Sequence, residues 1–121
     1  MPRHSKSDII RRCFAAYKSK DRKLLEQLLT DDFTFTSPYD DEIDKATYFE
    51  RCWPNSERIR THIFEKIFEQ GDEAFVRYKC ITNEGTEFRN TEFFALDGDR
   101  IRRVEVYFGA TYKDGVFVKD E

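Results

Sequence analysis

One acidic residue in the C-terminal half is predicted to lie on an otherwise apolar strand face. In the segment 86–96, strand alternation places Phe88 and Phe94 on one face, and the same face carries Asn90 and Glu92. Burial disfavours the charged form of a carboxyl and raises its pKa. Glu92 could then carry a proton near neutral pH, or donate a hydrogen bond as the neutral acid. The alternative is a glutamate paired with an arginine at the sheet edge or at a dimer contact, because one register slip would turn it outward.

Three more side chains are considered beside this carboxyl. Tyr78 alternates with Cys80, so it is expected on the side of the sheet that faces the helices, where its hydroxyl needs a partner. His62 is the only histidine outside the N-terminal tail, and no carboxylate is assigned beside it. We therefore interpret His62 as a satisfied or exposed residue rather than a base. In the segment 100–108, alternation alone does not say whether the set that contains Tyr107 faces inward.

A second acidic feature is the segment TSPYDDEID, residues 36–44, which holds four carboxylates within five residues. Neither the glycine nor the last glutamate of a calcium-binding EF-hand loop stands at the required spacing, so no metal site is predicted. Asp44 is well placed to cap a helix. Asp40 and Asp41 remain on a loop that could border the mouth of a pocket, and Asp41 is kept as a second candidate acid-base residue.

The signatures of several other chemistries are missing. No serine, histidine and acid follow one another around a nucleophile elbow. The glycines stand singly in turns and do not form a phosphate-binding loop. We therefore expect no cofactor, no nucleotide binding and no nucleophilic catalysis.

Charge and cysteine content restrict the partners and the location. The 121 residues carry a net charge of −3, so no overall positive field would hold nucleic acid or an anionic membrane. No apolar run approaches the length of a membrane span. Three cysteines form no metal-binding pair, and their odd number favours reduced thiols. The sequence predicts a cytoplasmic protein that binds neither nucleic acid nor membranes, and the basic segment 1–30 leaves docking to an acidic partner as a further alternative.

The elements that must position these side chains begin with helices. Ser5 is followed three residues later by Asp8, a capping box that starts a first helix whose apolar residues recur at three- and four-residue steps. Asp21 caps a second, shorter helix of leucines that ends at the cluster 30–32. Asp44 caps a third helix, which stops before a proline.

Strands make up most of the remaining chain. The segment FTFTS alternates apolar and polar residues and predicts a first strand. Turn residues then separate four longer strands at about 58–69, 74–82, 86–96 and 100–108. These patterns predict a curved antiparallel sheet with the helices on one face, which is an α+β architecture. No linker or repeat divides the chain, so residues 1–121 are predicted to form a single domain.

The order of these elements resembles a known superfamily. The segments DIIRRCFAAYKSKD, LLTDDFTFTSP and DGDRIRRVEVYFG, which are spread over nearly the whole chain, are similar to the nuclear transport factor 2-like superfamily. This superfamily includes SnoaL-like polyketide cyclases and ketosteroid isomerases, and DDEIDKATYFERCWPNS looks most like the small SnoaL-like proteins. The resemblance implies a cystatin-like α+β barrel, in which three N-terminal helices pack on a strongly curved, mixed or antiparallel sheet to form a cone with a pocket. It also implies a homodimer through the outer sheet face.

The resemblance implies positions for three catalytic residues, and this sequence matches one of them. Ketosteroid isomerases use a base carboxylate before the proline that follows the first strand, a tyrosine on the first helix and a protonated acid on a late strand. These positions fall on Ser37, Cys13 and Glu92, so only the last one matches. The implied pocket is lined from the first helix, the third helix and the inner sheet face. Its candidate ligand-binding residues are Cys13, Tyr17, Phe35, Cys52, Trp53, Tyr78, Asn90, Phe94 and Tyr107.

Two functions stay open on the sequence alone. The first is a protein with a pocket for a small apolar or aromatic molecule and with isomerase, cyclase or dehydratase chemistry on a carbonyl or polyketide-like compound. Glu92 would be the acid-base residue there, assisted by Tyr17, Tyr78 or Asp41. The second is a non-catalytic ligand-binding or dimerisation module, which the unmatched roles at Ser37 and Cys13 favour.

Overall fold

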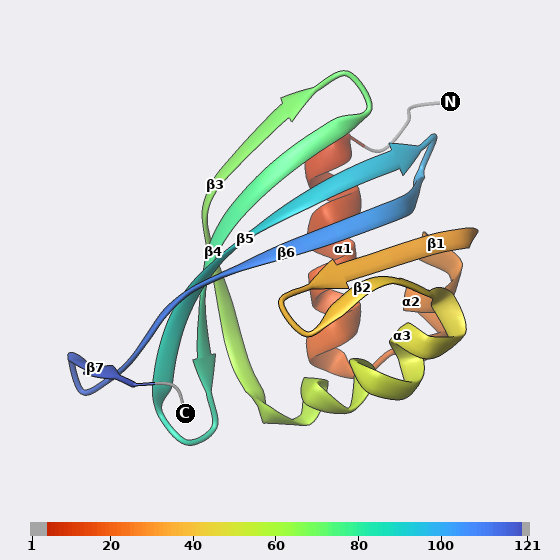
Figure 1. The fold of residues 1–121 in the computed structure, drawn as a ribbon. Helices are drawn as coiled ribbons and strands as arrows, with labels where there is room; N and C mark the ends of the chain where they lie inside the picture. Colours follow the sequence, from red (N-terminus) through yellow and green to blue (C-terminus); the bar gives the residue numbers. More distant parts are fainter. Residues whose placement is uncertain (1–4, 120–121) are drawn as a thin grey trace.

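The computed structural model describes residues 5–119, in which the helices cover one face of a bent sheet (Figure 1). The elements in chain order are α1 (Lys6–Ser19), α2 (Arg22–Leu28), β1 (Leu29–Ser37), β2 (Asp40–Asp44), α3 (Lys45–Arg51), the 3-10 helix η1 (Trp53–Arg58), β3 (Ile59–Gln70), β4 (Glu73–Thr82), β5 (Thr86–Asp97), β6 (Arg100–Lys113) and β7 (Val116–Val118). The predicted α+β class, with three α-helices on a curved sheet, is confirmed.

The sheet is mixed and open. Its strand order is β2-β1-β6-β5-β4-β3, and β7 adds to the far end of β6. All neighbours are antiparallel except β1 and β6, which run parallel and pair Phe35 with Val104. The first strand inserts beside the last long one, so the sheet is mixed, one of the two forms that the resemblance implied, whereas the strand patterns alone predicted antiparallel pairing. Within the described residues, β2 and β3 remain as edges, so the strands form an open cone and not a closed barrel.

The predicted helix starts are confirmed by their caps. The Ser5 hydroxyl accepts a hydrogen bond from the Asp8 amide at 3.1 Å, and the carboxylates of Asp21 and Asp44 cap α2 and α3 in the same way. These bonds satisfy amides that a first helical turn leaves without partners. The buried stripe of α1 consists of Ile9, Ile10, Phe14 and Ala16. It places the first helix against the inner face of the sheet.

We expect Ser5→Ala to destabilise the protein by about 1 kcal/mol, because the Asp8 amide would lose its side-chain acceptor. Urea denaturation followed by far-ultraviolet circular dichroism measures this loss. Ser5→Asn is the matched control, since asparagine is an equally good capping residue and should restore most of the stability. An alanine variant as stable as the wild type would show that this cap contributes nothing.

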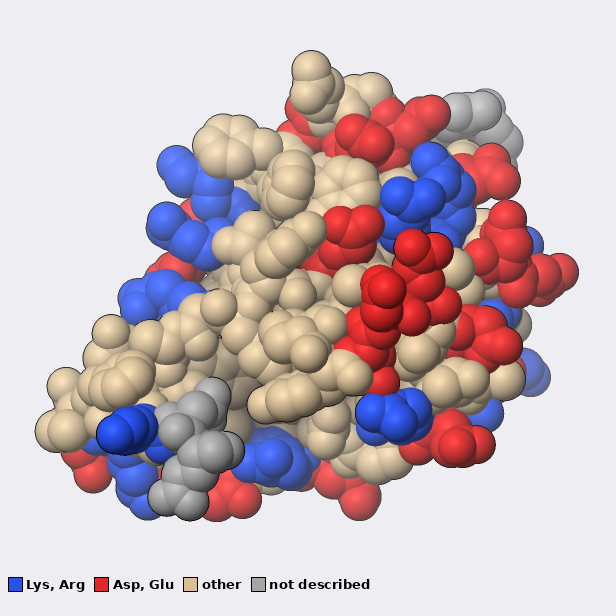
Figure 2. Space-filling model, in the orientation of Figure 1, with Lys and Arg blue, Asp and Glu red and all other residues tan. Residues whose placement is uncertain are grey.

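Two segments differ from the predicted elements. β1 begins directly after α2, so the cluster 30–32 lies in a strand and not in a turn. The acidic stretch was expected to be a loop, but residues Asp40–Asp44 form β2, which pairs with β1 as a hairpin. Acidic side chains gather over this hairpin in Figure 2. Strand pairing compensates for the low strand propensity of aspartate, because a hairpin fixes the backbone through its ladder of hydrogen bonds.

The bend of the sheet comes from irregular pairing. The register shifts between Phe64 and Lys66 where β3 meets β4, and between Phe88 and Asn90 where β5 meets β6. Such bulges increase the local twist of a strand. At the second shift, the backbone of Gly109 approaches the Arg89 carbonyl so closely that a Cβ would overlap it. Only glycine fits this contact, which brings β6 across the end of the cavity.

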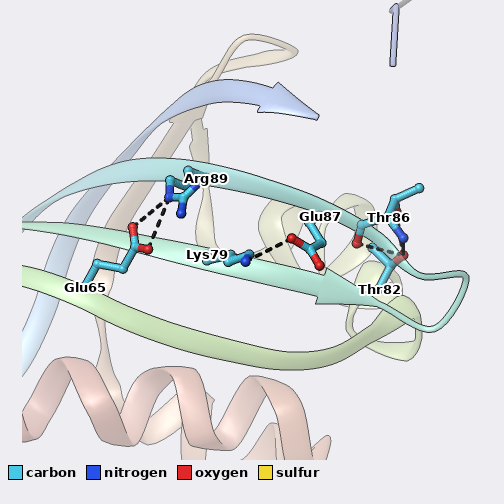
Figure 3. A network of polar contacts seen from close by, with 6 residues as sticks. All are labelled: Glu65, Lys79, Thr82, Thr86, Glu87 and Arg89. Carbon is cyan, nitrogen blue, oxygen red and sulfur yellow. Dashed lines mark hydrogen bonds and ion pairs between the residues drawn. The ribbon is translucent and has the colours of Figure 1, made fainter. Parts of the chain in front are cut away.

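The outer face of the sheet carries a polar network (Figure 3). The Glu65 carboxylate accepts from the Arg89 Nε at 2.9 and 3.2 Å, and Lys79 pairs with Glu87 at 2.9 Å. These side chains alternate with buried residues of β4 and β5, so they point away from α1. The contacts link β3, β4 and β5 across the ladder and leave the opposite face for the cavity.

Candidate functional site

A cavity of about 690 Å³ lies between the helices and the inner face of the sheet. That volume is in the usual range for small-molecule pockets. Its deep part is aromatic and aliphatic, with Phe14 from α1, Phe33 from β1, Phe94 from β5 and Val104 from β6. The residues that line it and are themselves exposed come from the β1–β2 turn, the end of α3, η1 and β6, so the mouth opens among those segments.

One chain of polar groups crosses the inner face of the sheet. Tyr78 on β4 pairs with Asn90 on β5, and Glu92 stands two residues further along β5 on the same face. The Tyr78 hydroxyl donates to the Glu92 carboxylate in a short hydrogen bond and accepts from the Asn90 side-chain amide at 3.2 Å. The Asn90 oxygen accepts from the Gly109 amide at 3.3 Å. This series of hydrogen bonds orients the Glu92 carboxyl, and both Glu92 and Tyr78 line the cavity.

The position of Glu92 changes its protonation. Burial raises the pKa of this carboxyl from 4.5 to about 7, although the hydrogen bond from Tyr78 favours the ionised form. Burial also raises the pKa of Tyr78 well above its usual value, and the neighbouring Glu92 charge adds to that effect. Near neutral pH, the tyrosine thus stays a hydrogen-bond donor, and Glu92 can both accept and release a proton.

His62 is a cavity residue that sequence reasoning did not place there. Its ring lies edge-on to Phe14, with the centroids 5.0 Å apart, and 5.5 Å from the ring of Tyr78. Burial, together with the positive charge of Lys18, lowers the pKa of His62 from 6.5 to about 4. The imidazole is therefore neutral at physiological pH. The strand alternation that placed Tyr78 inward could have found it, because His62 pairs with Cys80 across β3 and β4.

The three cysteines line the same cavity. The resemblance placed Cys13 and Cys52 in the pocket, whereas Cys80 was not among the candidates. Burial raises the pKa of Cys52 to about 11 and that of Cys80 to about 12, and it raises the pKa of Cys13 further still. Thiols with such pKa values stay protonated and are poor nucleophiles at neutral pH. They contribute apolar surface to the cavity wall.

The structure brings most of the sequence-predicted site residues together. Those that line the cavity are Cys13, Tyr17, Phe35, Cys52, Tyr78, Asn90, Glu92 and Phe94. The Tyr17 hydroxyl is already engaged, since it donates to the Cys52 carbonyl at 2.9 Å. Burial raises the pKa of Tyr17 well above its usual value, so it remains a neutral phenol.

Three predicted site residues lie elsewhere. Trp53 packs against the rings of Tyr17 and Phe49 and is not part of the cavity wall. Tyr107 is 54% exposed on the outer face, where its hydroxyl donates to Glu105. Asp41 is exposed, and its neighbour Asp40 lines the cavity in its place. Adjacent residues of a strand point to opposite sides, so the choice between the two aspartates depended on a strand that the sequence did not indicate.

Residues 5–119 contain neither a cluster of metal ligands nor a helix suited to span a membrane. No group of three or more histidine, cysteine, aspartate or glutamate side chains there is arranged to hold a metal ion. None of the helices in that part of the chain combines the length and the apolar character needed to cross a bilayer.

The chain is similar to one protein family and to several solved structures. The model of the SnoaL-like domain matches residues 10–104. No curated protein matches the chain.

Several solved structures share the fold at low sequence identity. An NTF2-like protein of unknown function from Cytophaga hutchinsonii has a TM-score of 0.71 at 18% identity, over 88% of this chain and 92% of that one. A candidate polyketide cyclase from Sinorhizobium meliloti has a TM-score of 0.67 at 22% identity, over 82% and 93%. A hypothetical protein with a ketosteroid isomerase-like fold from Catenulispora acidiphila, in complex with trimethylamine, has a TM-score of 0.71 at 13% identity, over 87% and 88%.

Proposed function

Because this chain belongs to the SnoaL-like domain family, we propose that its cavity binds a small apolar or aromatic molecule and that Glu92 moves a proton on it. The observation that carries the proposal is the Glu92 carboxyl, which faces an apolar cavity with a pKa of about 7. A carboxyl of that pKa is nearly as effective a base as an acid at neutral pH, which suits general acid-base catalysis.

The proton transfer would be internal to the site. The ionised Glu92 takes a proton from a carbon next to a carbonyl group, and the electron pair of that bond moves onto the carbonyl oxygen. The neutral acid then returns the proton to another atom of the same molecule, so an isomerisation needs no net gain or loss of protons. Tyr78 and Asn90 keep the carboxyl oriented through their hydrogen bonds. The first of these steps also begins a cyclisation or a dehydration. In a cyclisation the carbon that lost the proton attacks a second carbonyl group of the same molecule, and the proton held by Glu92 goes to the oxygen of that group. In a dehydration the proton goes to a departing hydroxyl group, which leaves as water.

The expected substrates are carbonyl or polyketide-like compounds. One acid-base residue supplies about 10²–10⁴-fold of rate, which suffices only where the C–H bond is already acidified by a neighbouring carbonyl. The aromatic wall of the cavity offers edge and face contacts to flat rings. A fold shared with a candidate polyketide cyclase is in keeping with this class of substrate.

Deuterium exchange tests the proposal without knowledge of the natural substrate. An aromatic diketone incubated in heavy water with the wild-type protein should exchange its acidified C–H faster than in buffer, as followed by proton NMR. Glu92→Gln should lose about 100-fold of the protein-dependent rate, because an amide cannot accept the proton.

Glu105→Gln is the matched control for this exchange, since that carboxylate bonds to Tyr107 on the outer face. It should exchange like the wild type. Equal rates for wild type and Glu92→Gln would remove Glu92 from the chemistry. Binding of the diketone without any exchange would favour the second candidate, a non-catalytic binding module.

Two observations favour that second candidate. Ser37 lines the cavity where the resemblance places a base carboxylate, and Cys13 stands where it places a tyrosine. The outer sheet face also exposes large apolar side chains, namely Ile63, Phe68, Phe75 and Tyr107. We accordingly keep a homodimer through this face as part of the proposal, together with a cytoplasmic location that the three free thiols favour.

A further inference from the structure

The mouth of the cavity differs in charge from its interior. Four charged side chains belong to the lining, and they are Asp40, Arg51, Arg58 and Glu92. Glu92 stands in the buried part, whereas both arginines are exposed at the mouth. At the mouth, the lining thus holds two arginines against the single carboxylate of Asp40.

Within the part of the chain that the structure describes, Arg51 has a carboxylate partner and Arg58 has none. Arg51, at the end of α3, pairs with Asp40 of β2 at 2.7 Å. The Asp40 side chain is only 9% exposed, so this pair is held between α3 and the hairpin and leaves the carboxylate little room for another partner. The Arg58 side chain takes part in no ion pair or hydrogen bond among residues 5–119.

The backbone around Arg58 is anchored by two hydrogen bonds, whereas its side chain makes no polar contact with the other residues of 5–119. Its carbonyl accepts from the Asn83 amide at 2.9 Å, and the Asn83 side chain donates to the Glu57 carbonyl at 2.8 Å. These two bonds attach the end of η1 to the turn between β4 and β5. The backbone of Arg58 is thus fixed beside the mouth, and the five donors of its guanidinium are within reach of a ligand there.

The apolar interior of the cavity and its Glu92 carboxyl determine the orientation of an anionic ligand. A carboxylate placed deep in the cavity would lose its hydration and would meet the Glu92 carboxyl, which is costly for two like groups. At the mouth it would keep part of its hydration and accept two parallel hydrogen bonds from a guanidinium. An apolar molecule with one acidic end would therefore enter with that end outward, and its apolar body would lie against Phe14, Tyr78 and Glu92.

We propose that Arg58 is a specificity-determining residue, and that the cavity prefers an apolar or aromatic molecule that ends in a carboxylate. This inference rests on the proposed function, because it assumes that the cavity binds a small molecule. It adds the class of that molecule and the direction in which it lies.

Two probes of nearly the same shape test the preference. Naphthylacetic acid and naphthylacetamide differ only in the terminal group, which is a carboxylate in the first and a neutral amide in the second. Isothermal titration calorimetry at neutral pH and low ionic strength measures the affinity of each. The wild type should bind the acid about fivefold more tightly than the amide, as one partly exposed charge-assisted contact provides. Arg58→Gln should remove this preference and leave the affinity for the amide unchanged.

Arg60→Gln is the matched control. Arg60 lies two residues away on β3, where it is exposed and does not line the cavity. Its replacement by glutamine changes the net charge of the protein by the same amount as Arg58→Gln. This variant should keep the preference for the acid. Equal affinities of both probes for the wild type, or a preference that survives Arg58→Gln, would overturn the inference while the cavity still binds. If neither probe bound, the proposed function would fail together with it.

Discussion

Phe14→Ala is expected to destabilise the protein by about 3–5 kcal/mol, the usual cost of removing a large aromatic side chain from a core. Phe14 is 8% exposed, and its ring packs against the rings of His62, Phe64, Tyr78 and Phe94. Its centroid lies 4.9 Å from both Phe64 and Tyr78 and 5.0 Å from His62. Because Phe14 also lines the cavity, its removal would enlarge an existing space that the neighbours cannot close.

Urea denaturation measures this loss, and Phe117→Ala is the control. Phe117 belongs to β7 and is 59% exposed, so its truncation should change the free energy of unfolding by no more than about 0.5 kcal/mol. A Phe14 variant within 1 kcal/mol of the wild type would mean that the aromatic cluster around α1 contributes far less than its packing indicates.

Glu92→Gln should make the protein more stable at mildly alkaline pH, by about 2–3 kcal/mol. The folded protein holds Glu92 at a pKa of about 7, above its ordinary value of 4.5, so the fold favours the protonated form. The stability that this preference provides is fully present below pH 4.5, the pKa of Glu92 in the unfolded chain. It is lost as the pH rises through about 7, the pKa of Glu92 in the folded protein. Glutamine keeps the shape and a hydrogen bond with Tyr78 but has no charge to bury.

The measurement is the free energy of unfolding of both proteins over a series of pH values. The gain of Glu92→Gln should shrink toward pH 4.5 and be complete above about 7. The stability difference between the wild type and Glu105→Gln, a change on the outer face, should not depend on pH in this way. A difference between wild type and Glu92→Gln that does not change with pH would show that the carboxyl is solvated in the fold.

His62 should limit stability from the acidic side. Burial lowers its pKa from 6.5 to about 4, so its contribution is present above the unfolded pKa and is lost as the pH falls through the folded one. The two groups oppose each other, since Glu92 favours a low pH and His62 a high one. The wild type should therefore be most stable in the weakly acidic range between their transitions.

Local patterns in the sequence were sufficient for the helices and for the inward side of β5. Caps at Ser5, Asp21 and Asp44 are side-chain contacts within one helical turn, so they need no knowledge of the fold. In β5, four apolar or amide residues of one parity surround Glu92, and a sheet with one covered face leaves such a strand a single acceptable register.

Long-range pairing accounts for what local patterns missed. Nothing near Asp40 indicates β2, because that strand exists through its ladder with β1. Strand alternation alone did not decide on which side of the sheet Tyr107 lies, because both sets of alternate residues in β6 include large side chains. Its pairing with Thr91 of β5 places it on the outer face. The extension of β6 to Lys113 and the addition of β7 likewise depend on contacts with β5 and with each other.

The parallel pairing of β1 with β6 joins Leu29 to Ile101, two residues that stand far apart along the chain. Folds dominated by such distant contacts lose much chain entropy before the contacts form, and they fold slowly for their size. During synthesis on the ribosome, the helices and the hairpin would emerge long before the strand that completes the sheet beside them. The edge of β1 that pairs with β6 would stay unpaired until then, so chaperone binding to the nascent chain is expected at this first hairpin.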